Sequence, residues 1–470
     1  MKKLYFLIAF VVIVLIVVGG FFIYKNYFSK ETQTSTTNTK PVKLDPQKEA
    51  THLSKVAGEK NAYWMRGFDV VWNVIEPEKG KYNWEENDRM LTEFKDGQAQ
   101  GAYHLSIIWP YANWDQITCH SGKKYVATGH LKRGGEDLYM GAPCDMEAYS
   151  QFIREVVERY DGDGRDDMPD LKIPVKYWEI INEPEMQGGG FGGAGEDLKF
   201  FVGTPQEYVE ILETSYKAIK KADSSAKVLY AGMAGMQKNF QDFWDPVFAG
   251  GGGGYFDIAN IHSISTDEQR EDLYVIKFKK YLEKYGIENK PIWVTEVQFG
   301  QLMDKPKDLT AFEKLMVRAT VFSLAQGAEK LFFIENWTMW DNKEMFKPPE
   351  EDDESKKETK GKPPKLDLSN NSTHKVYLNL VDKINSFDKI ETIKEKFTEG
   401  QDDREGATSQ VAQYKFVNGD KAVYVLWGNA ELPTEITGKL KVTDIYGVSR
   451  EVETSALQLS DSPLFVELKK

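Results

Sequence analysis

The chain has 470 residues, which is more than one average domain, although a single α/β barrel can absorb about 250 residues or more. We therefore expect two folded units. With 41% hydrophobic and 13% aromatic residues the chain can build a large core, which excludes disorder across its body. A net charge of -13 and a pI near 5.2 argue against binding to a phosphate backbone, so nucleic acid is excluded as an expected partner.

The N-terminal segment is strongly apolar. A run from Leu4 to Tyr24 follows two lysines and is long enough to cross a bilayer as a helix. A cleaved signal peptide is the competing interpretation, but no A-x-A-like cleavage site ends the run. The sequence favours an uncleaved transmembrane anchor over residues 1–30 and a polar, Thr-rich tether over residues 31–40. We expect a single-pass protein of the cell membrane whose large C-terminal part is extracellular.

The chain has two cysteines, Cys119 and Cys144, and both fall within one long insertion. An oxidising exterior would let them close that insertion as a disulfide. The alternative is a zinc site formed by Cys119, His120, His130 and Cys144, but this spacing fits no common zinc module. We therefore infer no metal at these residues.

Residues 41–387 alternate apolar β-like runs with amphipathic helical stretches, which is typical of parallel strands joined by crossover helices. Asp45 before Pro46 predicts a helix N-terminus, and this helix should run to about Lys60. Further helices are expected at residues 84–100, 146–160 and 374–387. Seven strands are expected at residues 64–72, 102–109, 175–184, 227–232, 256–263, 291–297 and 330–336. An eight-stranded barrel then needs its first strand near residues 41–44, where the signal is short.

The composition changes after the barrel region. Residues 347–365 are rich in Lys, Glu, Asp and Pro, which predicts a solvated excursion before the last helix. Residues 388–470 contain short alternating segments such as QVAQYKFVNG and KAVYVLWG, separated by turn residues. This pattern predicts a second domain, a small all-β sandwich.

Two segments place carboxyl groups at the ends of expected strands. YWEIINEPE puts Asn182 and Glu183 at the carboxyl end of one strand, and PIWVTEVQFG puts Glu296 at the same end of a strand three positions further round. An α/β barrel builds its active site at this end. Paired carboxyl groups suggest glycoside hydrolysis, because one protonates the leaving oxygen while the other attacks the anomeric carbon. A salt-bridged rim carboxylate is the alternative for either residue alone, and two in register argue against it.

Four ordered motifs carry a family resemblance: WNVIEPEKGKYNW at residues 72–84, YWEIINEP ending at Pro184, FDIANIHS ending at Ser263, and WVTE ending at Glu296. In these motifs the chain resembles the clan A glycoside hydrolases, which are retaining enzymes on (β/α)8 barrels. The resemblance implies that Glu183 is the acid/base, that Glu296 is the nucleophile, and that Asn182 contacts a sugar 2-hydroxyl. The expected C-terminal sandwich is similar to an accessory domain of some members.

Three further residues are candidates for the site. Arg66, in YWMRGF, resembles the family arginine that holds the nucleophile ionised, and its alternative is an ion pair with Glu179. His262 ends the sixth strand, where related enzymes place a His or Tyr near the nucleophile or the substrate; a packed polar residue is the alternative. Trp337, in FFIENW, could offer its flat face to a sugar ring, and core packing is the alternative.

The segment DGDGRDD contains Asp161, Asp163 and Asp167 and resembles a calcium loop, although it lacks the full pattern with a terminal glutamate. A solvated acidic turn is the alternative. We expect no cofactor elsewhere, and a structural calcium ion at this loop stays open.

The sequence thus predicts a retaining glycoside hydrolase that acts on a β-linked glycan or glycoside by double displacement. One alternative is a surface carbohydrate-binding protein on an inactive barrel, since fold alone does not establish activity. A transglycosidase is another, because it differs only in whether water or a sugar intercepts the intermediate. The sugar and the linkage depend on loop shapes that the sequence does not give.

Overall fold

The computed structural model describes residues 40–56, 59–93, 101–121, 139–186, 199–265, 270–300, 304–340 and 368–469. The predicted membrane anchor, nearly all of the predicted tether and the acidic excursion at 347–365 lie outside these residues. Within the described part of the chain, no helix is long and apolar enough to cross a membrane.

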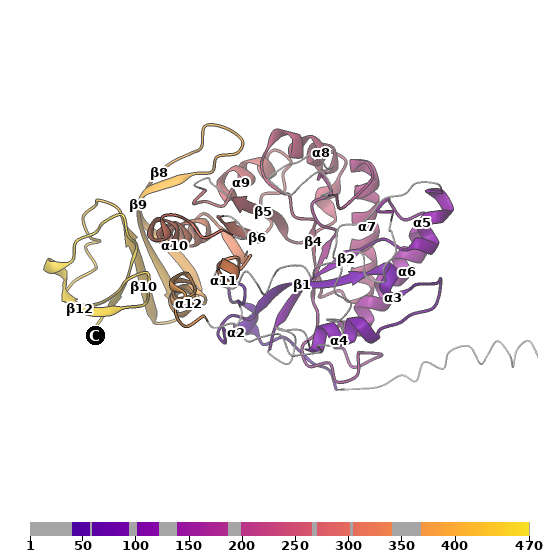
Figure 1. The fold of residues 1–470 in the computed structure, drawn as a ribbon, viewed down its shortest axis with the longest axis horizontal. Coiled ribbons are helices and arrows are strands. Elements are labelled where there is room, and N and C mark those ends of the chain that lie inside the picture. Colours follow the sequence, from indigo (N-terminus) through magenta and orange to yellow (C-terminus); the bar gives the residue numbers. More distant parts are fainter. Residues whose placement is uncertain are drawn as a thin grey trace, which may run out of the picture.

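Parallel strands form the centre of the larger part of the molecule (Figure 1). They are β1 (Trp64–Val71), β2 (Tyr103–Trp109), β3 (Tyr177–Ile180), β4 (Lys227–Tyr230), β5 (Ala259–Ser265), β6 (Ile292–Phe299) and β7 (Ala328–Phe333). The ladders join β1 to β4 and β5 to β7 in chain order, and isolated parallel bridges at Leu229–Ile258 and Met233–Ile261 connect the two sets. This arrangement fits the predicted (β/α)8 barrel.

The barrel closes through a very short first strand. Leu53 forms a parallel bridge with Leu331 of β7, and Ser54 forms one with Trp64 of β1. The expectation of a first strand near residues 41–44 is therefore wrong, because residues 53–54 occupy that place. Two residues are too few to show a strand pattern in the sequence, so only their neighbours on either side define them.

The first helix is also shorter than expected. Helix α2 (Pro46–Glu49) has four residues, so the helix predicted to reach Lys60 ends much earlier. Its N-terminus is as predicted, because the Asp45 side chain accepts a hydrogen bond from the Gln47 amide and proline occupies the first turn. The chain has to leave the helix early because it enters the barrel wall at residue 53.

Helices cover the outside of the parallel strands (Figure 1). They are α3 (Trp72–Ile75), α4 (Glu85–Glu93), α5 (Asn113–Cys119), α6 (Met146–Tyr160), α7 (Pro205–Ala222), α8 (Lys238–Ala249), α9 (Val275–Glu283), α10 (Leu309–Ala325), α11 (Trp337–Trp340) and α12 (Ser372–Ile384). The longest of them, α7, begins with a complete capping box in which Thr204 and Glu207 satisfy each other's backbone amides.

The end of the barrel where the strands begin is closed. An aromatic layer fills its interior, and the Lys330 ammonium lies 4.4 Å from the Trp64 ring centroid while donating to the Glu49 and Thr51 carbonyls. The first described residues cross this end from outside: the Val42 amide donates to the Gly162 carbonyl. In the described part of the chain, these residues therefore close the barrel interior at the end where its strands begin.

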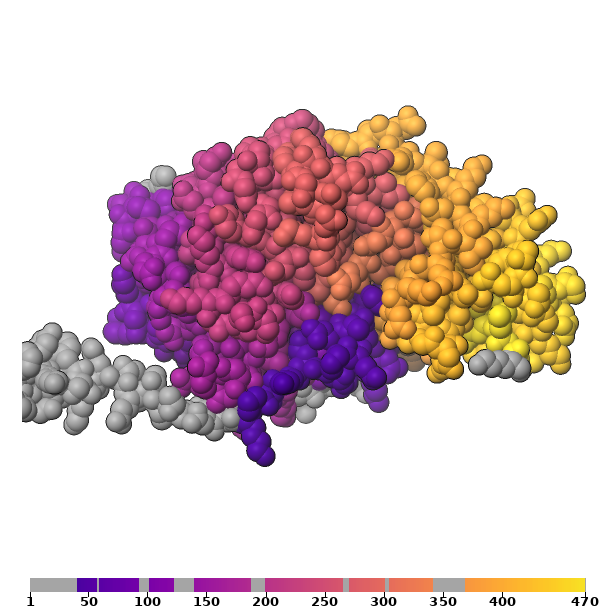
Figure 2. Space-filling view, turned by 180° about the vertical axis from the view of Figure 1, so that it is seen from behind, coloured from indigo at the N-terminus to yellow at the C-terminus, as the bar shows by residue number. Residues whose placement is uncertain are grey.

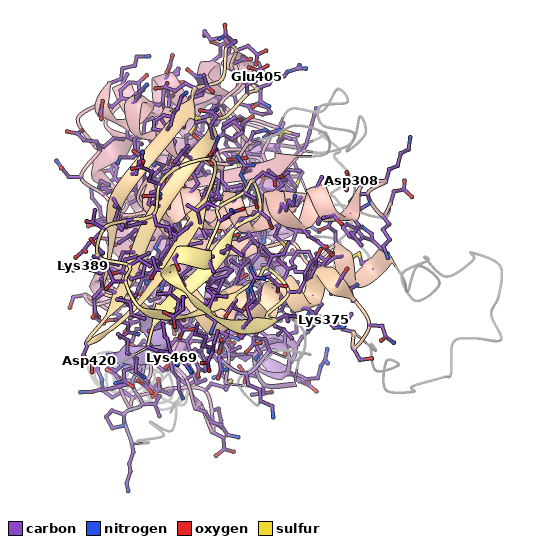
Figure 3. The ribbon with its side chains drawn as sticks, turned by 90° about the vertical axis from the view of Figure 1, so that its left-hand side faces the viewer. Asp308, Lys375, Lys389, Glu405, Asp420 and Lys469 are labelled. Atoms are coloured by element: carbon purple, nitrogen blue, oxygen red, sulfur yellow. A yellow bond between two sulfur atoms is a disulfide. The ribbon has the colours of Figure 1, made fainter. Side chains whose placement is uncertain are left out.

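The C-terminal part is a β sheet, which Figure 3 shows from the side opposite the barrel. Its strands are β8 (Lys389–Thr398), β9 (Thr408–Asn418), β10 (Lys421–Trp427), β11 (Lys439–Thr443), β12 (Ser449–Glu453) and β13 (Leu464–Leu468), in the antiparallel order β12-β11-β13-β10-β9-β8. The all-β prediction holds, but the described strands form one sheet rather than the two facing sheets of a sandwich. The barrel takes the place of a second sheet, because Tyr414, Phe416 and Trp427 belong to the same apolar core as the barrel helices.

The barrel and the sheet form one continuous body (Figure 2). A buried polar cluster joins them: the Glu271 carboxylate accepts hydrogen bonds from the Ser409 amide at 2.8 Å and hydroxyl at 2.5 Å, and pairs with Arg318 at 2.9 Å. The Tyr446 hydroxyl on the sheet side donates to Glu313 of α10 at 2.8 Å. Buried charges that need partners from both parts fix how the two parts dock.

The predicted disulfide is present. Cys119 and Cys144 are bonded, with their Cα atoms 5.8 Å apart. The zinc alternative fails because the bond consumes both thiolates, and its fourth residue, His130, lies outside the described residues. The Asp115 carboxylate also accepts hydrogen bonds from the Cys144 and Asp145 amides at 2.8 and 2.9 Å, so the same segment is held twice.

Candidate active site

Charged and polar side chains from four barrel strands gather in one place. Arg66 comes from β1, Glu183 follows β3, His262 comes from β5 and Glu296 comes from β6. Because residues 53–54 form the first barrel strand, β3 and β6 are the fourth and the seventh strands of the barrel. The two glutamates therefore occupy the positions that the family resemblance assigns to acid/base and nucleophile.

Irregular strand pairing accompanies these residues. The register of β1 against β2 shifts between Arg66 and Phe68, and that of β5 against β6 shifts between Ile261 and His262. A third shift, between Val294 and Val297, flanks Glu296 in its pairing with β7. Bulges of this kind turn a side chain out of the regular alternation. They allow neighbouring strands to aim these groups at one place.

Glu183, His262 and Glu296 form a compact cluster. The His262 Nδ1 atom lies 2.6 Å from Glu183 Oε1 and 3.8 Å from Glu296 Oε2. One carboxylate oxygen of each glutamate and one ring nitrogen all lie within 4.8 Å of one another. Glu183 and His262 are buried, while the Glu296 side chain is 19% exposed. The more accessible carboxylate is thus the one that the sequence assigns as nucleophile.

Arg66 holds three oxygen-bearing side chains in place. Its guanidinium donates to Glu296 Oε1 at 2.5 Å, to Glu179 at 2.7 and 2.9 Å, and to Asn182 Oδ1 at 2.6 Å. Burial by itself would lower the pKa of Arg66, but the Glu179 and Glu296 carboxylates together raise it. Arg66 therefore forms the ion pair with Glu179 that the sequence offered as an alternative, and the same guanidinium also pairs with Glu296, while its role toward a nucleophile stays a prediction.

Replacing Arg66 by Met should lower the free energy of unfolding by about 3–5 kcal/mol, because the fully buried Glu179 carboxylate loses its cation. Urea unfolding followed by tryptophan fluorescence measures the change. Adding Glu179→Gln to the same chain should recover part of the loss, since an amide needs no counter-charge. A single-variant loss under about 1 kcal/mol would contradict a buried ion pair.

The surroundings of the Glu183 carboxyl raise its pKa. Burial raises its pKa, and the negative charge of Glu296 adds to that effect, which together outweigh the opposing influence of His262 and Arg66. Burial alone would lower the pKa of His262, yet the Glu296 and Glu183 carboxylates raise it. Because the pKa of each group is raised, the Glu183–His262 pair keeps a shared proton to higher pH than either isolated group would.

The backbone around Glu183 is strained. Ile181 has a φ of 66° and Glu183 a φ of 35°, in the left-handed region that β-branched and bulky residues rarely adopt. Residues in such conformations cost about 1–3 kcal/mol each and cluster at functional sites. The strain here turns the Glu183 side chain from the end of β3 toward His262.

Gly232 leaves the space that His262 needs. A Cβ atom at this position would lie 2.0 Å from His262 Nε2 and 2.4 Å from its Cδ2. The Gly232 amide also donates to Glu179 Oε1 at 3.2 Å. A side chain at residue 232 would therefore push the imidazole away from Glu183.

The expectation that Trp337 offers its flat face to a sugar ring is wrong. Its side chain is fully buried, at 0% exposure, and its ring centroid lies 6.2 Å from that of Phe333 and 6.1 Å from that of Tyr377. An indole enclosed in this way offers no face to a sugar ring, so the core-packing alternative describes it. The position of Trp337 after a barrel strand does not decide where its side chain points.

Sequence reasoning missed three buried polar residues close to the site. Thr295 and Asn260 lie behind His262, and both are buried. Glu185, two residues after Glu183, is also buried; burial and the nearby Glu183 charge raise its pKa to about 8. The signal available was the presence of polar residues inside apolar strand segments, in FDIANIHS and WVTE, and of a second glutamate in NEPE.

The acidic loop after α6 brings Asp161, Asp163 and Asp167 together. One carboxylate oxygen of each lies within 4.8 Å of the others, which is a donor set that calcium accepts. Backbone amides of the loop already donate to all three carboxylates. Burial raises the pKa of Asp161 to about 7. Calcium binding at this loop stays a prediction.

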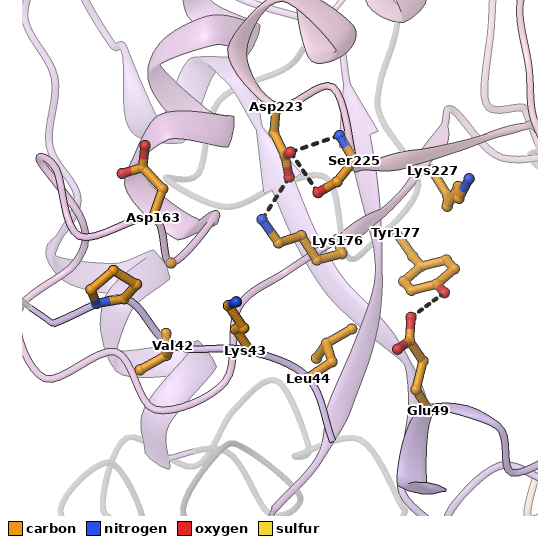
Figure 4. Close-up of a pocket in the computed structure, with 12 residues that line it drawn as sticks. Val42, Lys43, Leu44, Glu49, Asp163, Lys176, Tyr177, Asp223, Ser225 and Lys227 are labelled. Atoms are coloured by element: carbon orange, nitrogen blue, oxygen red, sulfur yellow. Dashed lines mark hydrogen bonds and ion pairs between the residues drawn. The ribbon is translucent and has the colours of Figure 1, made fainter. Parts of the chain in front are cut away.

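A cavity of about 530 Å³ lies at the opposite end of the barrel (Figure 4). The chain from Pro41 to Leu44 crosses it, and Asp163 lines one side. Two pairs of lining side chains bond to each other: Lys176 with Asp223 at 2.7 Å, and Tyr177 with Glu49 at 2.6 Å. The lining includes none of the residues that the sequence assigns to catalysis, so the cavity is not the candidate active site.

No protein-family model matches the sequence, and no curated protein matches it. Solved structures do match. They include a family 39 glycoside hydrolase from Bacteroides cellulosilyticus, with 15% identity, 91% of this chain and 80% of that chain covered, and a TM-score of 0.50. A glucosidase from Croceicoccus marinus has 13% identity, with 93% and 98% covered and a TM-score of 0.51. A monomeric β-xylosidase from Caulobacter crescentus has 12% identity, with 92% and 98% covered and a TM-score of 0.51.

At these identities the likeness shows the fold. The chain has the fold of the clan A glycoside hydrolases, as its motifs indicated.

Proposed function

We propose that the protein is a retaining glycoside hydrolase that cleaves a β-linked glycan or glycoside by double displacement, with Glu296 as nucleophile and Glu183 as acid/base. One observation carries the proposal: an oxygen of Glu183 and an oxygen of Glu296 lie within 4.8 Å of each other. Retaining enzymes place their carboxyl groups about 5–5.5 Å apart, whereas inverting enzymes need roughly 6.5–9.5 Å to admit a water molecule.

In the first step a Glu296 oxygen attacks the anomeric carbon, and the bond from that carbon to the leaving oxygen breaks. The proton of Glu183 passes to the leaving oxygen, so the aglycone departs as a neutral alcohol. Arg66 donates to Glu296 Oε1 at 2.5 Å, and its other hydrogen bonds hold it on Glu179 and Asn182. The guanidinium therefore fixes Oε1 of Glu296, and Oε2 lies on the side of His262, 3.8 Å from its Nδ1.

In the second step Glu183, now ionised, removes a proton from water. The resulting nucleophile attacks the anomeric carbon of the glycosyl–Glu296 ester, and Glu296 leaves as a carboxylate. Two inversions at one carbon give net retention. The cycle ends with Glu183 protonated and Glu296 ionised, which are the starting forms.

Asn182 supports an assignment to sugar binding. Its Oδ1 accepts from Arg66, which leaves its Nδ2 group to donate toward a ligand. Together with the glucosidase and β-xylosidase among the similar structures, this makes β-glucosides and β-xylosides the first substrates to test.

The test is a panel of aryl β-glycosides and β-linked polysaccharides, with the anomeric configuration of the first product read by proton NMR. Release of a β product supports retention. An α product would exclude double displacement. Adding sugar acceptors to an active reaction separates hydrolysis from transglycosylation, because only a transglycosidase diverts most product to the acceptor. Binding without any turnover across the panel would favour a carbohydrate-binding protein.

We also propose that residues 1–30 anchor the enzyme in the cell membrane with residues 41–470 outside, on the strength of the apolar run from Leu4 to Tyr24. Intact protein should sediment with membranes and resist extraction by carbonate, and truncation after Lys40 should give soluble, active enzyme. Mature protein from the native host that begins after Tyr24 and is secreted would instead identify a signal peptide.

A further inference from the structure

A chain of buried hydrogen bonds runs behind His262. Asn260 Nδ2 donates to the backbone carbonyl of Tyr230 at 3.2 Å. The Thr295 hydroxyl donates to Asn260 Oδ1 at 2.7 Å, and His262 Nε2 lies 3.0 Å from Thr295 Oγ1. On its other side His262 Nδ1 meets Glu183 at 2.6 Å. The chain joins β4, β5 and β6 to the proposed acid/base.

The backbone carbonyl of Tyr230, at the far end of this chain, determines which group donates and which accepts in each of its hydrogen bonds. A backbone carbonyl only accepts, so the amide group of Asn260 has to present its NH₂ to Tyr230 and its oxygen to Thr295. That oxygen also only accepts, so Thr295 uses its single hydroxyl proton on it. The Thr295 oxygen is then left to accept, and His262 Nε2 has to be the donor.

We propose that Asn260 and Thr295 are positioning residues that fix the neutral tautomer of His262, so that the lone pair of Nδ1 faces Glu183 and receives the proton of its carboxylic acid. This inference rests on the proposed function, because the tautomer of His262 determines whether the proposed acid/base, Glu183, keeps its proton. It assigns a role to two residues that the two-carboxylate mechanism does not use.

The His262 ring and its hydrogen-bond partners are shielded from water. Asn260 and His262 have 0% exposure and Thr295 has 2%, so water does not compete for these hydrogen bonds. Charged groups face His262 from three elements: Glu183 after β3, Glu296 on β6 and Arg66 on β1. From the β4 side the ring meets Gly232, which carries no charge and no side chain.

The alternative tautomer would impair the first chemical step. If Nδ1 carried the proton of a neutral ring, it would donate to Glu183 and favour the ionised carboxylate. Glu183 would then have no proton for the leaving oxygen. With Nε2–H committed to Thr295, the neutral ring can only accept at Nδ1, and the acid keeps its proton until the substrate takes it.

The first test compares Thr295→Val with Thr295→Ser. Valine keeps the branched shape and removes the hydroxyl, whereas serine keeps the hydroxyl. For a substrate with a poor leaving group, Thr295→Val should lower kcat/KM by about 10-fold or more, because acid assistance is weakened. For an activated leaving group the loss should be about threefold or less, since little proton donation is needed. Thr295→Ser should recover most of the activity on both substrates.

Equal losses on both substrates, or a serine variant as impaired as the valine variant, would overturn the proposal and leave Thr295 a packing residue. Urea unfolding of both variants checks that each remains folded. If Thr295→Val does not fold, the second test decides.

The second test reads the tautomer directly in the unaltered protein. Enzyme labelled with ¹⁵N at its six histidines is observed in two-bond proton–nitrogen correlation spectra, and His262→Gln identifies the His262 signals. At the pH of measurement Nε2 should carry a proton and Nδ1 should not. Protonation at Nδ1, with or without Nε2, would overturn the inference. This spectrum needs no substrate, so it stands or falls apart from the hydrolase proposal, which the glycoside panel tests.

Discussion

Glu296→Gln should abolish turnover of every glycoside that the enzyme cleaves, with kcat lowered on the order of 10⁴-fold or more. An amide cannot form the glycosyl ester, so the first step has no nucleophile. The fold should remain, because Arg66 keeps Glu179 and Asn182 as partners and Glu296 is the most accessible carboxylate of the cluster. Initial rates on the best aryl glycoside, with thermal unfolding alongside, measure both effects.

A small external anion provides a sharper check on Glu296. Azide added to Glu296→Ala can enter the space that the removed carboxyl group leaves and attack the anomeric carbon of an activated substrate. The product should then be a glycosyl azide of inverted configuration, which identifies the position from which Glu296 attacks. Turnover near that of the unaltered enzyme without azide would remove the nucleophile assignment.

Glu183→Gln should show a loss that depends on the leaving group. For alkyl glycosides kcat/KM should fall by about 10²–10⁴-fold, because general acid catalysis of the first step is lost. For aryl glycosides with strongly acidic leaving groups the first step should be nearly unaffected, and the intermediate should accumulate because water is no longer activated. Pre-steady-state bursts of phenolate detect this accumulation.

Glu185→Gln is the matched control for Glu183. It lies two residues away in the same motif, and burial raises its pKa to about 8, which favours the neutral acid near pH 7, a form that an amide mimics. Its Oε1 accepts from the Ala234 amide at 2.6 Å, which a glutamine oxygen can do equally. Glu185→Gln should therefore retain general acid catalysis of the first step by Glu183. An equal loss in both variants would mean that the motif is sensitive to any change.

The pH dependence of the first step has a defined sign. Glu183 acts while protonated, and burial raises its pKa, so its activity as an acid extends to higher pH than that of an exposed glutamate. The rate with a poor leaving group should fall as pH rises through that pKa. In Glu183→Gln this alkaline fall should disappear from kcat/KM, while the acidic limb remains.

Local sequence was sufficient for the residues that contact each other at strand ends. That Glu183 and Glu296 lie close together was predictable because strand ends in a parallel barrel meet on one rim, and Arg66 contacts Glu296 from within β1. Asn260 and Thr295 were not predicted, because their roles depend on hydrogen bonds to residues 30 to 35 positions away. Nothing local distinguishes these from polar residues that merely pack.

The short first strand shows the same limit in the fold. Leu53 and Ser54 are in the barrel wall because β7 and β1 lie on either side of them, and neither residue signals a strand. The C-terminal strands were predictable from their alternation, yet their assembly into one sheet depends on the barrel core that covers one face. The sequence also did not show where the Trp337 side chain points, because its direction follows from packing against Phe333 and Tyr377.

The chain enters the barrel at its closed end, where the Val42 amide binds the Gly162 carbonyl and Lys330 seals the interior. The cluster of Glu183, His262 and Glu296 lies at the other end of the same strands. The first described residues and the proposed active site are therefore at opposite ends of the barrel.

For an enzyme held at a surface through its N-terminus, this polarity sets the approach of substrate. A tether of ten residues can extend at most about 35 Å, so it would let the body tilt but keep the attached pole nearest the bilayer. The mouth would then face the medium, and glycans arriving from outside would reach it without passing between the enzyme and the lipid. Sugars attached to the lipid itself would first meet the closed end of the barrel.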